Sequence, residues 1–172
     1  LHPFPAPMAI LSRPYRGRAA CVHCGFCMFF GCEVGAKSST LAALLPLAER
    51  SARCEIRPES YARKIELGRN GRVTGVIYFD PRGREVFQRA NAVVVCANGA
   101  ETPRLLLLSK SNRFPQGLAN SSGLVGKYLM FDAGAFCSGL FEHPLNEFKS
   151  VQVTRLIHDF YHADPRRGFY GG

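Results

Sequence analysis

Four cysteines crowd into one short stretch and are the most reactive side chains of the chain. Cys21, Cys24, Cys27 and Cys32 follow the spacing C-x2-C-x2-C-x4-C. Thiolates at this density can hold an iron–sulfur cluster or a zinc ion, and two of them can form a disulfide in an oxidising compartment. The last gap is one residue longer than in bacterial ferredoxins, and Glu33 stands where those proteins have proline. These residues alone leave four interpretations open: a redox cluster, a zinc site, a disulfide or simple burial.

A second stretch suited to chemistry is VVVCANGAETPRLLLLS. The β-branched run Val93–Val95 predicts a strand buried on both faces, with Cys96 as a small core residue at its end. Gly99 is expected to adopt a backbone conformation that a Cβ would resist, and Pro103 suits the start of a helix over Thr102–Ser109. Such a turn presents free backbone N–H groups, which can hold a phosphate or the edge of a flavin. An ordinary βα unit of any α/β protein has the same pattern.

Other functional patterns are missing from the sequence. It contains no G-x-S-x-G, H-E-x-x-H or G-x-G-x-x-G, so a hydrolase has no support. The net charge is +9, but the arginines are spread over the chain rather than massed on one segment. Nucleic-acid binding is therefore not expected, and a solvated basic surface is the preferred interpretation of this charge. An attractive field for an anionic cofactor or an acidic partner protein explains it as well. No apolar run approaches the length of a transmembrane helix.

The elements that must position these residues follow from local patterns. Ser38 or Ser39 is a suitable N-cap for a helix near Thr40–Ser51, which Pro46 would kink or break. Strands are predicted near Glu55–Arg57 and Ala62–Leu67 and in the segments VTGVIYF and EVFQR, with turns at Asn70-Gly71 and at Asp80-Pro81-Arg82-Gly83. Further strands are predicted near Ala133–Leu140 and within Lys149–Phe160, and the first twenty residues are predicted to be loop. The fold class is mixed α/β with a β-meander.

Several blocks of the sequence, taken in order, resemble the middle of a glucose–methanol–choline (GMC) oxidoreductase. The resemblance covers about residues 18 to 132, and the blocks are GCEVGAKSST, SYARKIEL, GRVTGVIYFDPRGRE, AVVVCANGAETPRLLLLS and GLANSSGLVGKYLMFD. It implies part of an FAD-binding, Rossmann-like domain and the start of a substrate-binding domain. The implied division is 1–50 for a cysteine-rich segment and helix at the domain junction, 51–113 for FAD binding and 114–172 for substrate binding.

The resemblance also implies an activity, which is oxidation of a CH–OH group of an alcohol or sugar by hydride transfer to FAD. It places main-chain groups of Tyr61 and Ala62 against the adenine end of FAD. It places Ala97, Asn98, Gly99 and Ala100 along the flavin side of the turn, and Thr102 and Pro103 match a signature of the family. The catalytic histidine and its partner belong to a C-terminal segment of the family that this chain lacks. We therefore expect the chain to be a fragment that is inactive by itself.

One branch of the family, the sugar and gluconate dehydrogenases, is similar in its cysteines. By that resemblance Cys21, Cys27 and Cys32, with Cys24 as the alternate, would hold an iron–sulfur cluster that passes electrons to a cytochrome c rather than to oxygen. A periplasmic or membrane-associated location would fit the full-length protein of such a branch. The alternative to a flavoprotein is a ferredoxin-like electron-transfer module, in which the cysteines carry the function and the rest is scaffold.

Overall fold

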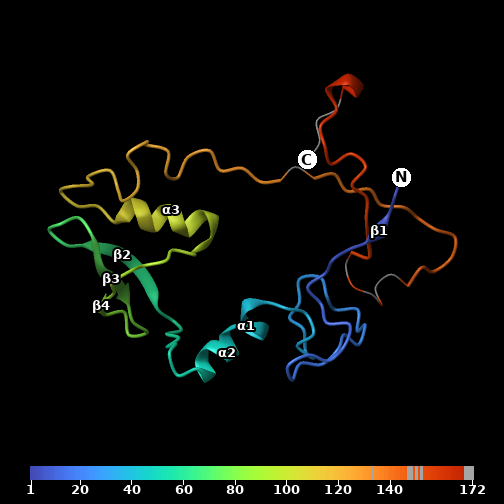
Figure 1. The fold of residues 1–172 in the computed structure, drawn as a ribbon, viewed down its shortest axis with the longest axis horizontal. Coiled ribbons are helices and arrows are strands. Elements are labelled where there is room, and N and C mark those ends of the chain that lie inside the picture. The colour runs from blue at the N-terminus through green and yellow to red at the C-terminus, as the bar shows by residue number, and fades with distance from the viewer. Residues whose placement is uncertain (133, 147–148, 150, 152, 169–172) are drawn as a thin grey trace. The chain divides into compact units, whose positions relative to one another are not determined.

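A computed structural model describes residues 1–132, 134–146, 149, 151 and 153–168. Its fold is mixed α/β, as predicted, with short helices and two small antiparallel sheets (Figure 1). The chain divides into two compact units, one made of Leu1–Glu55 with Ser138–Gly172 and the other of Ile56–Cys137. This division puts residues 114–137 with the predicted meander. No helix among the described residues is long and apolar enough to cross a membrane.

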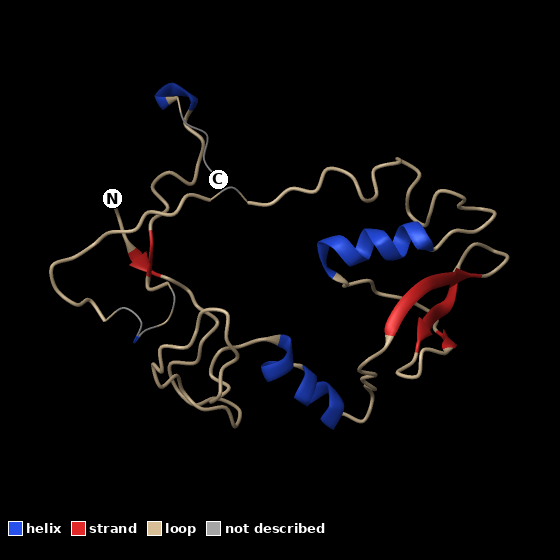
Figure 2. Cartoon of the chain, turned by 180° about the vertical axis from the view of Figure 1, so that it is seen from behind, coloured by secondary structure: helices blue, strands red, loops and turns tan. Residues whose placement is uncertain are grey.

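The unit Ile56–Cys137 is built on a three-stranded meander of β2 (Tyr61–Leu67), β3 (Val73–Phe79) and β4 (Glu85–Arg89), in the order β2-β3-β4 (Figure 2). Both predicted turns are confirmed. At the first, Gly71 has a φ of 78° and its N–H donates to the oxygen of Gly68. At the second, the Asp80 carboxylate accepts from the backbone N–H of Arg84. Short turns with left-handed glycines suit the right-handed twist of a hairpin, which explains why the sequence predicts this region well.

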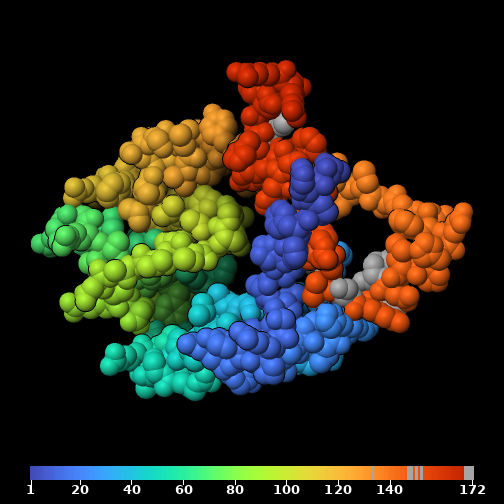
Figure 3. Space-filling view, turned by 45° about the vertical axis from the view of Figure 1, so that its right-hand side comes forward, coloured from blue at the N-terminus to red at the C-terminus, as the bar shows by residue number. Residues whose placement is uncertain are grey.

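Helix α3 (Asn98–Leu108) packs along β2, and Figure 3 shows its yellow-green residues against the green strands. Ile65 of β2 and Leu105 of α3 are both buried. Ser109, which is 1% exposed, joins the two elements, since its hydroxyl donates to the oxygen of Leu105 at 2.6 Å and accepts from the N–H of Ile65 at 2.9 Å. The bond from Ile65 satisfies a buried backbone donor on the edge of β2, which has no strand beside it among the described residues, and the bond to Leu105 satisfies the hydroxyl hydrogen. The contact fixes α3 on the sheet.

Three predicted strands are wrong over the residues that the structure describes. Glu55–Arg57, Val93–Val95 and residues 134–140 form no ladder. Val94 is 85% exposed, and Cys96, expected in the core, is exposed as well. An extended segment becomes a strand only when a neighbour takes up its backbone N–H and C=O groups, and these segments have no such neighbour in the described part of the chain. Ala133, at the start of the third prediction, lies outside the described residues.

In the other unit, the predicted helix near Thr40–Ser51 is two helices. α1 (Thr40–Ala43) begins at its predicted N-cap, where the Ser39 hydroxyl accepts from the N–H of Ala42 at 3.1 Å. α2 (Leu45–Arg50) follows at once, and Pro46 lies in its first turn. Proline has no N–H to donate there, so the break predicted at Pro46 falls just before it.

Two segments far apart in the sequence pair in a small sheet. Strand β1 (Phe4–Pro5), within a segment predicted to be loop, pairs with β5 (Arg155–Leu156), and a short helix (Pro165–Arg167) follows. Of the strand predicted over Lys149–Phe160, the described residues therefore form only β5, while Ser150 and Gln152 lie outside the described residues.

Candidate functional site

A hollow of about 420 Å³ lies between the start of β2 and the start of α3. It brings together four residues that the sequence analysis singled out from two distant segments: Tyr61, Ala62, Ala97 and Asn98. The other lining residues are Ser60, Cys96, Glu101, Arg104 and Leu105. The predicted Gly99, Ala100, Thr102 and Pro103 do not line it. We refer to this space as the β2–α3 hollow.

The turn into α3 depends on an asparagine rather than on a glycine. Asn98 has a φ of 66°, and its side-chain oxygen accepts from the N–H groups of Ala100 at 2.8 Å and Glu101 at 3.0 Å. Asparagine tolerates this left-handed conformation and caps the helix in the same step. Gly99 has no positive φ, and a Cβ added to it would meet nothing within 4 Å. The prediction that Gly99 supplies the special conformation is therefore wrong.

The capped start also moves the helix boundary. α3 begins at Asn98 rather than at Thr102, so Pro103 lies inside the helix instead of at its start. Thr102, in the first turns of α3, stabilises the turn that leads into the helix, because its hydroxyl oxygen accepts from the N–H of Ala97 at 3.2 Å. Thr102 thus positions Ala97 at the hollow without reaching the hollow itself.

A charged cluster that the sequence analysis missed forms one wall of the hollow. The Arg104 Nε donates to Glu101 Oε2 at 2.6 Å, and the Tyr61 hydroxyl lies 3.4 Å from the same oxygen. The Arg104 guanidinium also stands over the Tyr61 ring, 4.8 Å from its centroid. The i,i+3 spacing of Glu101 and Arg104 on a predicted helix was a signal for the ion pair, but nothing local pointed to the distant Tyr61.

This wall decides which ligand chemistry the hollow suits. The Glu101 carboxylate accepts hydrogen bonds from hydroxyl groups, and its ion pair with Arg104 leaves no net positive charge on this wall to hold a phosphate. Among the described residues β2 is an edge strand, and its residues Tyr61 and Ala62 line the hollow, so the unpaired edge of the strand lies beside the space that a planar heterocycle would occupy. The volume is at the lower end of the range for small-molecule sites. A flat ring carrying a sugar fits this arrangement better than a phosphate group does.

The structure does not bring the four clustered cysteines together as a site. All seven cysteines are free thiols, and no group of three or more ligand side chains among the described residues is arranged to hold a metal ion. The structure therefore gives no support to a cluster or zinc ion on Cys21, Cys24, Cys27 and Cys32, and none of the four forms a disulfide.

Cys32 is nevertheless held in a polar backbone turn. The backbone N–H of Lys37 does most to lower the pKa of the Cys32 thiol; burial opposes it, and the N–H groups of Ala36, Val34 and Gly35 add to the lowering. The Lys37 ammonium bonds elsewhere, to the backbone oxygens of Cys27 at 2.6 Å and Phe30 at 3.2 Å. These two bonds connect the cysteine segment to Lys37.

Comparison with known proteins shows which family and which individual proteins the chain is similar to. The family described as GMC oxidoreductase matches residues 9–131. The chain is 37% identical over 99% of its length to 2-methyl-1,2-propanediol dehydrogenase of Mycolicibacterium austroafricanum. It is 37% identical over 76% of its length to the fructose dehydrogenase large subunit of Gluconobacter japonicus, and 30% identical over 99% to the gluconate 2-dehydrogenase flavoprotein of Pantoea cypripedii.

The chain belongs to the GMC oxidoreductases, a family of FAD-binding enzymes, as the resemblance in its sequence implied. Its matches cover 31%, 23% and 30% of the lengths of these three relatives, respectively, so the chain spans less than a third of each.

Proposed function

We propose that the complete protein that contains this chain is an FAD-dependent oxidoreductase acting on CH–OH groups of alcohols or sugars, and that the β2–α3 hollow holds the adenosine part of FAD. The observation that carries the proposal is the convergence of Tyr61 and Ala62 with Ala97 and Asn98 on one hollow. The two segments are more than thirty residues apart in the sequence, and both belong to the stretch that matches the family.

The hollow has room for one end of the cofactor but not for both ends. Adenine and isoalloxazine lie at opposite ends of FAD, so a space of about 420 Å³ holds one of them. The open edge of β2 offers backbone groups to the adenine ring, and Glu101 offers an acceptor to the ribose hydroxyls, as acidic residues do in other dinucleotide sites. The family resemblance implies the flavin side for Ala97 and Asn98, but we propose the adenosine end for both, because they line the same space as Tyr61 and Ala62.

In this proposal the cofactor supplies the redox chemistry, and the residues of this chain bind and orient the cofactor. When bound, FAD takes up the hydride from the carbinol carbon of the substrate. The residues of this chain bind and orient: Asn98 caps α3, Thr102 fixes Ala97, and the ion pair of Glu101 and Arg104 sets the charge beside the ribose. The base that takes the hydroxyl proton is expected outside this chain.

The finer assignments extend this proposal. We assign residues 51–113 to a Rossmann-like FAD-binding domain, 114–172 to the start of a substrate-binding domain and 1–50 to their junction. We infer an electron acceptor other than oxygen, because the fructose and gluconate relatives are named dehydrogenases. A cytochrome c as the partner is proposed from the resemblance in sequence alone. The four clustered cysteines take no part in the proposal.

The test is a purification of the complete protein with a search for bound flavin. We expect a flavin absorption band, and we expect an alcohol or sugar substrate to bleach it under anaerobic conditions. A dye acceptor should restore the colour with turnover. A colourless protein that takes up no added FAD would contradict the proposal.

A further inference from the structure

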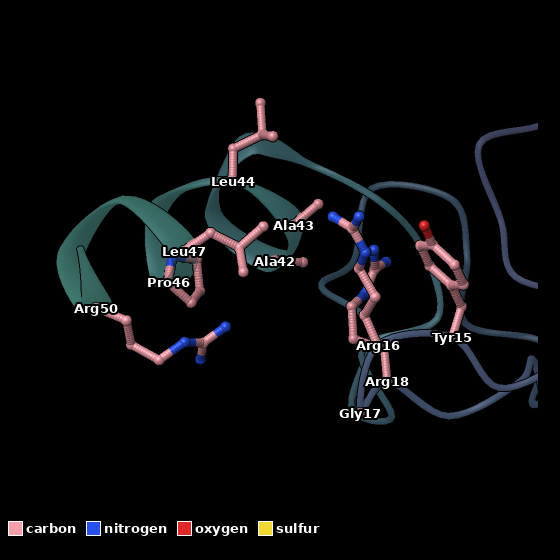
Figure 4. A pocket seen from close by; sticks show the side chains of 10 residues that line it. All are labelled: Tyr15, Arg16, Gly17, Arg18, Ala42, Ala43, Leu44, Pro46, Leu47 and Arg50. Carbon is pink, nitrogen blue, oxygen red and sulfur yellow. The ribbon is translucent and has the colours of Figure 1, made fainter.

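A second hollow, of about 460 Å³, lies in the unit that contains the N-terminus, between a tight turn and the helices α1 and α2 (Figure 4). Its lining residues are Tyr15, Arg16, Gly17, Arg18, Ala42, Ala43, Leu44, Pro46, Leu47 and Arg50. It shares no residue with the β2–α3 hollow. We refer to it as the arginine hollow.

The turn that carries two of the arginines is well defined. The backbones of Tyr15 and Arg18 exchange two hydrogen bonds, each of 3.0 Å. Between them Arg16 and Gly17 have φ values of 49° and 78°, which is the pattern of a two-residue type I′ hairpin turn. The Arg16 guanidinium stacks on Tyr15, 5.3 Å from the ring centroid. The turn thus holds Arg16 and Arg18 beside the same space.

Arg18 is anchored more firmly than its neighbour. Its Nε donates to the oxygen of Gly35 at 2.9 Å, and its Nη2 donates to the oxygen of Ala36 and to the Ser38 hydroxyl. These partners are neutral, so they orient the guanidinium and leave its charge unbalanced. Arg18 is therefore a fixed cation at the wall of the hollow.

The third arginine reaches the hollow from the opposite side. Arg50 extends from the last turn of α2 toward the space that Arg16 and Arg18 border (Figure 4). Within the described part of the chain, none of the three guanidinium groups forms an ion pair with a carboxylate. Three like charges around one hollow repel one another, and an anion between them would relieve that repulsion.

The rest of the lining is apolar. Ala42, Ala43, Pro46 and Leu47 line the hollow on the helix side. Figure 4 shows the side chain of Leu47 directed between Arg50 and the turn. A ligand that fills the hollow therefore needs an apolar body as well as a charged group, because bare inorganic ions leave the apolar wall uncovered.

We propose that the arginine hollow is a binding site for a small organic anion, with a carboxylate or phosphate group between Arg16, Arg18 and Arg50 and an apolar body against α1 and α2. Guanidinium groups bind carboxylates and phosphates by charge-assisted hydrogen bonds. The proposal concerns a site other than the one assigned to FAD and does not depend on that assignment.

The test is an NMR titration of the complete protein that contains this chain, in which the arginine Nε–H signals are followed. The probes are phenyl phosphate and benzoate, which share an apolar ring and differ in the anion, with inorganic phosphate as the probe without a ring. We expect at least one aromatic probe to shift the signals of Arg16, Arg18 and Arg50 and to bind more tightly than inorganic phosphate. Binding should weaken as salt is added.

Two variants and one control make the result specific. Arg16→Gln and Arg50→Gln should each weaken binding about three-fold, which is the usual size of an exposed charge contact. Arg13→Gln removes an equal charge from an exposed residue that does not line the hollow and should leave binding unchanged. Arg18 is left intact because its bonds support the loop.

Three outcomes would overturn the proposal. The first is the absence of any shift with all three probes. The second is an equal loss of binding in Arg13→Gln, which would indicate a diffuse charge effect. The third is competition of FAD with the aromatic probe in the complete protein, which would assign the hollow to the flavin site.

Discussion

The guanidinium of Arg104 stands over the ring of Tyr61, 4.8 Å from its centroid, and so joins the helix α3 to the first residue of β2. Glu101 completes the contact, since its Oε2 lies 2.6 Å from Arg104 Nε and 3.4 Å from the Tyr61 hydroxyl. Forty residues separate Tyr61 from Glu101. The wall of the β2–α3 hollow is thus a tertiary feature, and each of its parts can be tested separately.

Removing the charge of Glu101 should weaken cofactor binding. In Glu101→Gln the acceptor for a ribose hydroxyl is neutral and the Arg104 charge loses its partner. We expect the affinity of the complete protein for FAD to fall about three- to ten-fold. The matched control is Glu85→Gln, which removes a carboxylate paired with Arg63 at 3.0 Å on the meander, away from the hollow. Equal affinities in the two variants, measured by flavin fluorescence, would show that Glu101 has no part in binding.

The Ser109 hydroxyl should contribute measurably to the free energy of unfolding. Ser109→Ala leaves the buried N–H of Ile65 without a partner, and an unpaired buried donor costs about 1–3 kcal/mol. We expect the free energy of unfolding to fall by that amount in urea denaturation. Ser122→Ala removes an exposed hydroxyl that accepts from the N–H of Leu124, and it should change the free energy of unfolding by less than about 0.5 kcal/mol. An unchanged midpoint for Ser109→Ala would contradict this view of the α3–β2 contact.

Two glycines should respond in opposite ways to an added methyl group. A Cβ at Gly75 would overlap the backbone oxygen of Gln88 on β4, and backbone cannot move aside without breaking the β3–β4 ladder. We expect Gly75→Ala to lower the free energy of unfolding by about 1–3 kcal/mol. Gly99→Ala meets open space in a helix and should be neutral or stabilising by up to about 1 kcal/mol. Thermal melts of the two variants give the comparison, and a less stable Gly99→Ala would contradict it.

Local patterns in the sequence predict local structure well. The meander, both of its turns and the Ser39 cap depend on neighbours in the sequence, and all are confirmed. Val93–Val95 depend on a distant partner strand, and no side-chain pattern shows whether that partner is present. Asn98 and Gly99 are adjacent, and both residue types tolerate a positive φ, so the sequence alone favoured the wrong one.

The residues of the candidate site also fall into two groups, those that the sequence predicts and those that only the tertiary structure shows. The two segments that line the β2–α3 hollow were identified from the sequence through their family resemblance. The roles of Glu101, Arg104 and Ser109 were not, because each depends on a contact between α3 and β2. The spacing of the four cysteines was the most conspicuous pattern, yet the structure gives no support to a metal site there.

The Cys32 thiol should ionise more readily than an ordinary cysteine. The backbone N–H of Lys37, with those of its neighbours, stabilises the thiolate and so lowers the pKa of Cys32. A lower pKa means a larger thiolate fraction at neutral pH, and the thiolate is the form that iodoacetamide attacks. We expect the alkylation rate of Cys32, followed by peptide mass spectrometry, to reach half its plateau at a lower pH in the folded chain than in urea. A midpoint that does not move, or that moves upward on folding, would contradict the arrangement.

The most direct test of the central claim compares the adenosine end and the flavin end of FAD on the complete protein after its bound flavin has been removed. ADP carries the adenosine end and FMN the flavin end, and each is titrated to millimolar concentration while backbone NMR signals are recorded. We expect ADP to shift the signals of Tyr61, Ala62, Ala97 and Asn98 and FMN to leave them in place. Shifts of these four signals with FMN and not with ADP, or with neither, would contradict an adenosine site between β2 and α3.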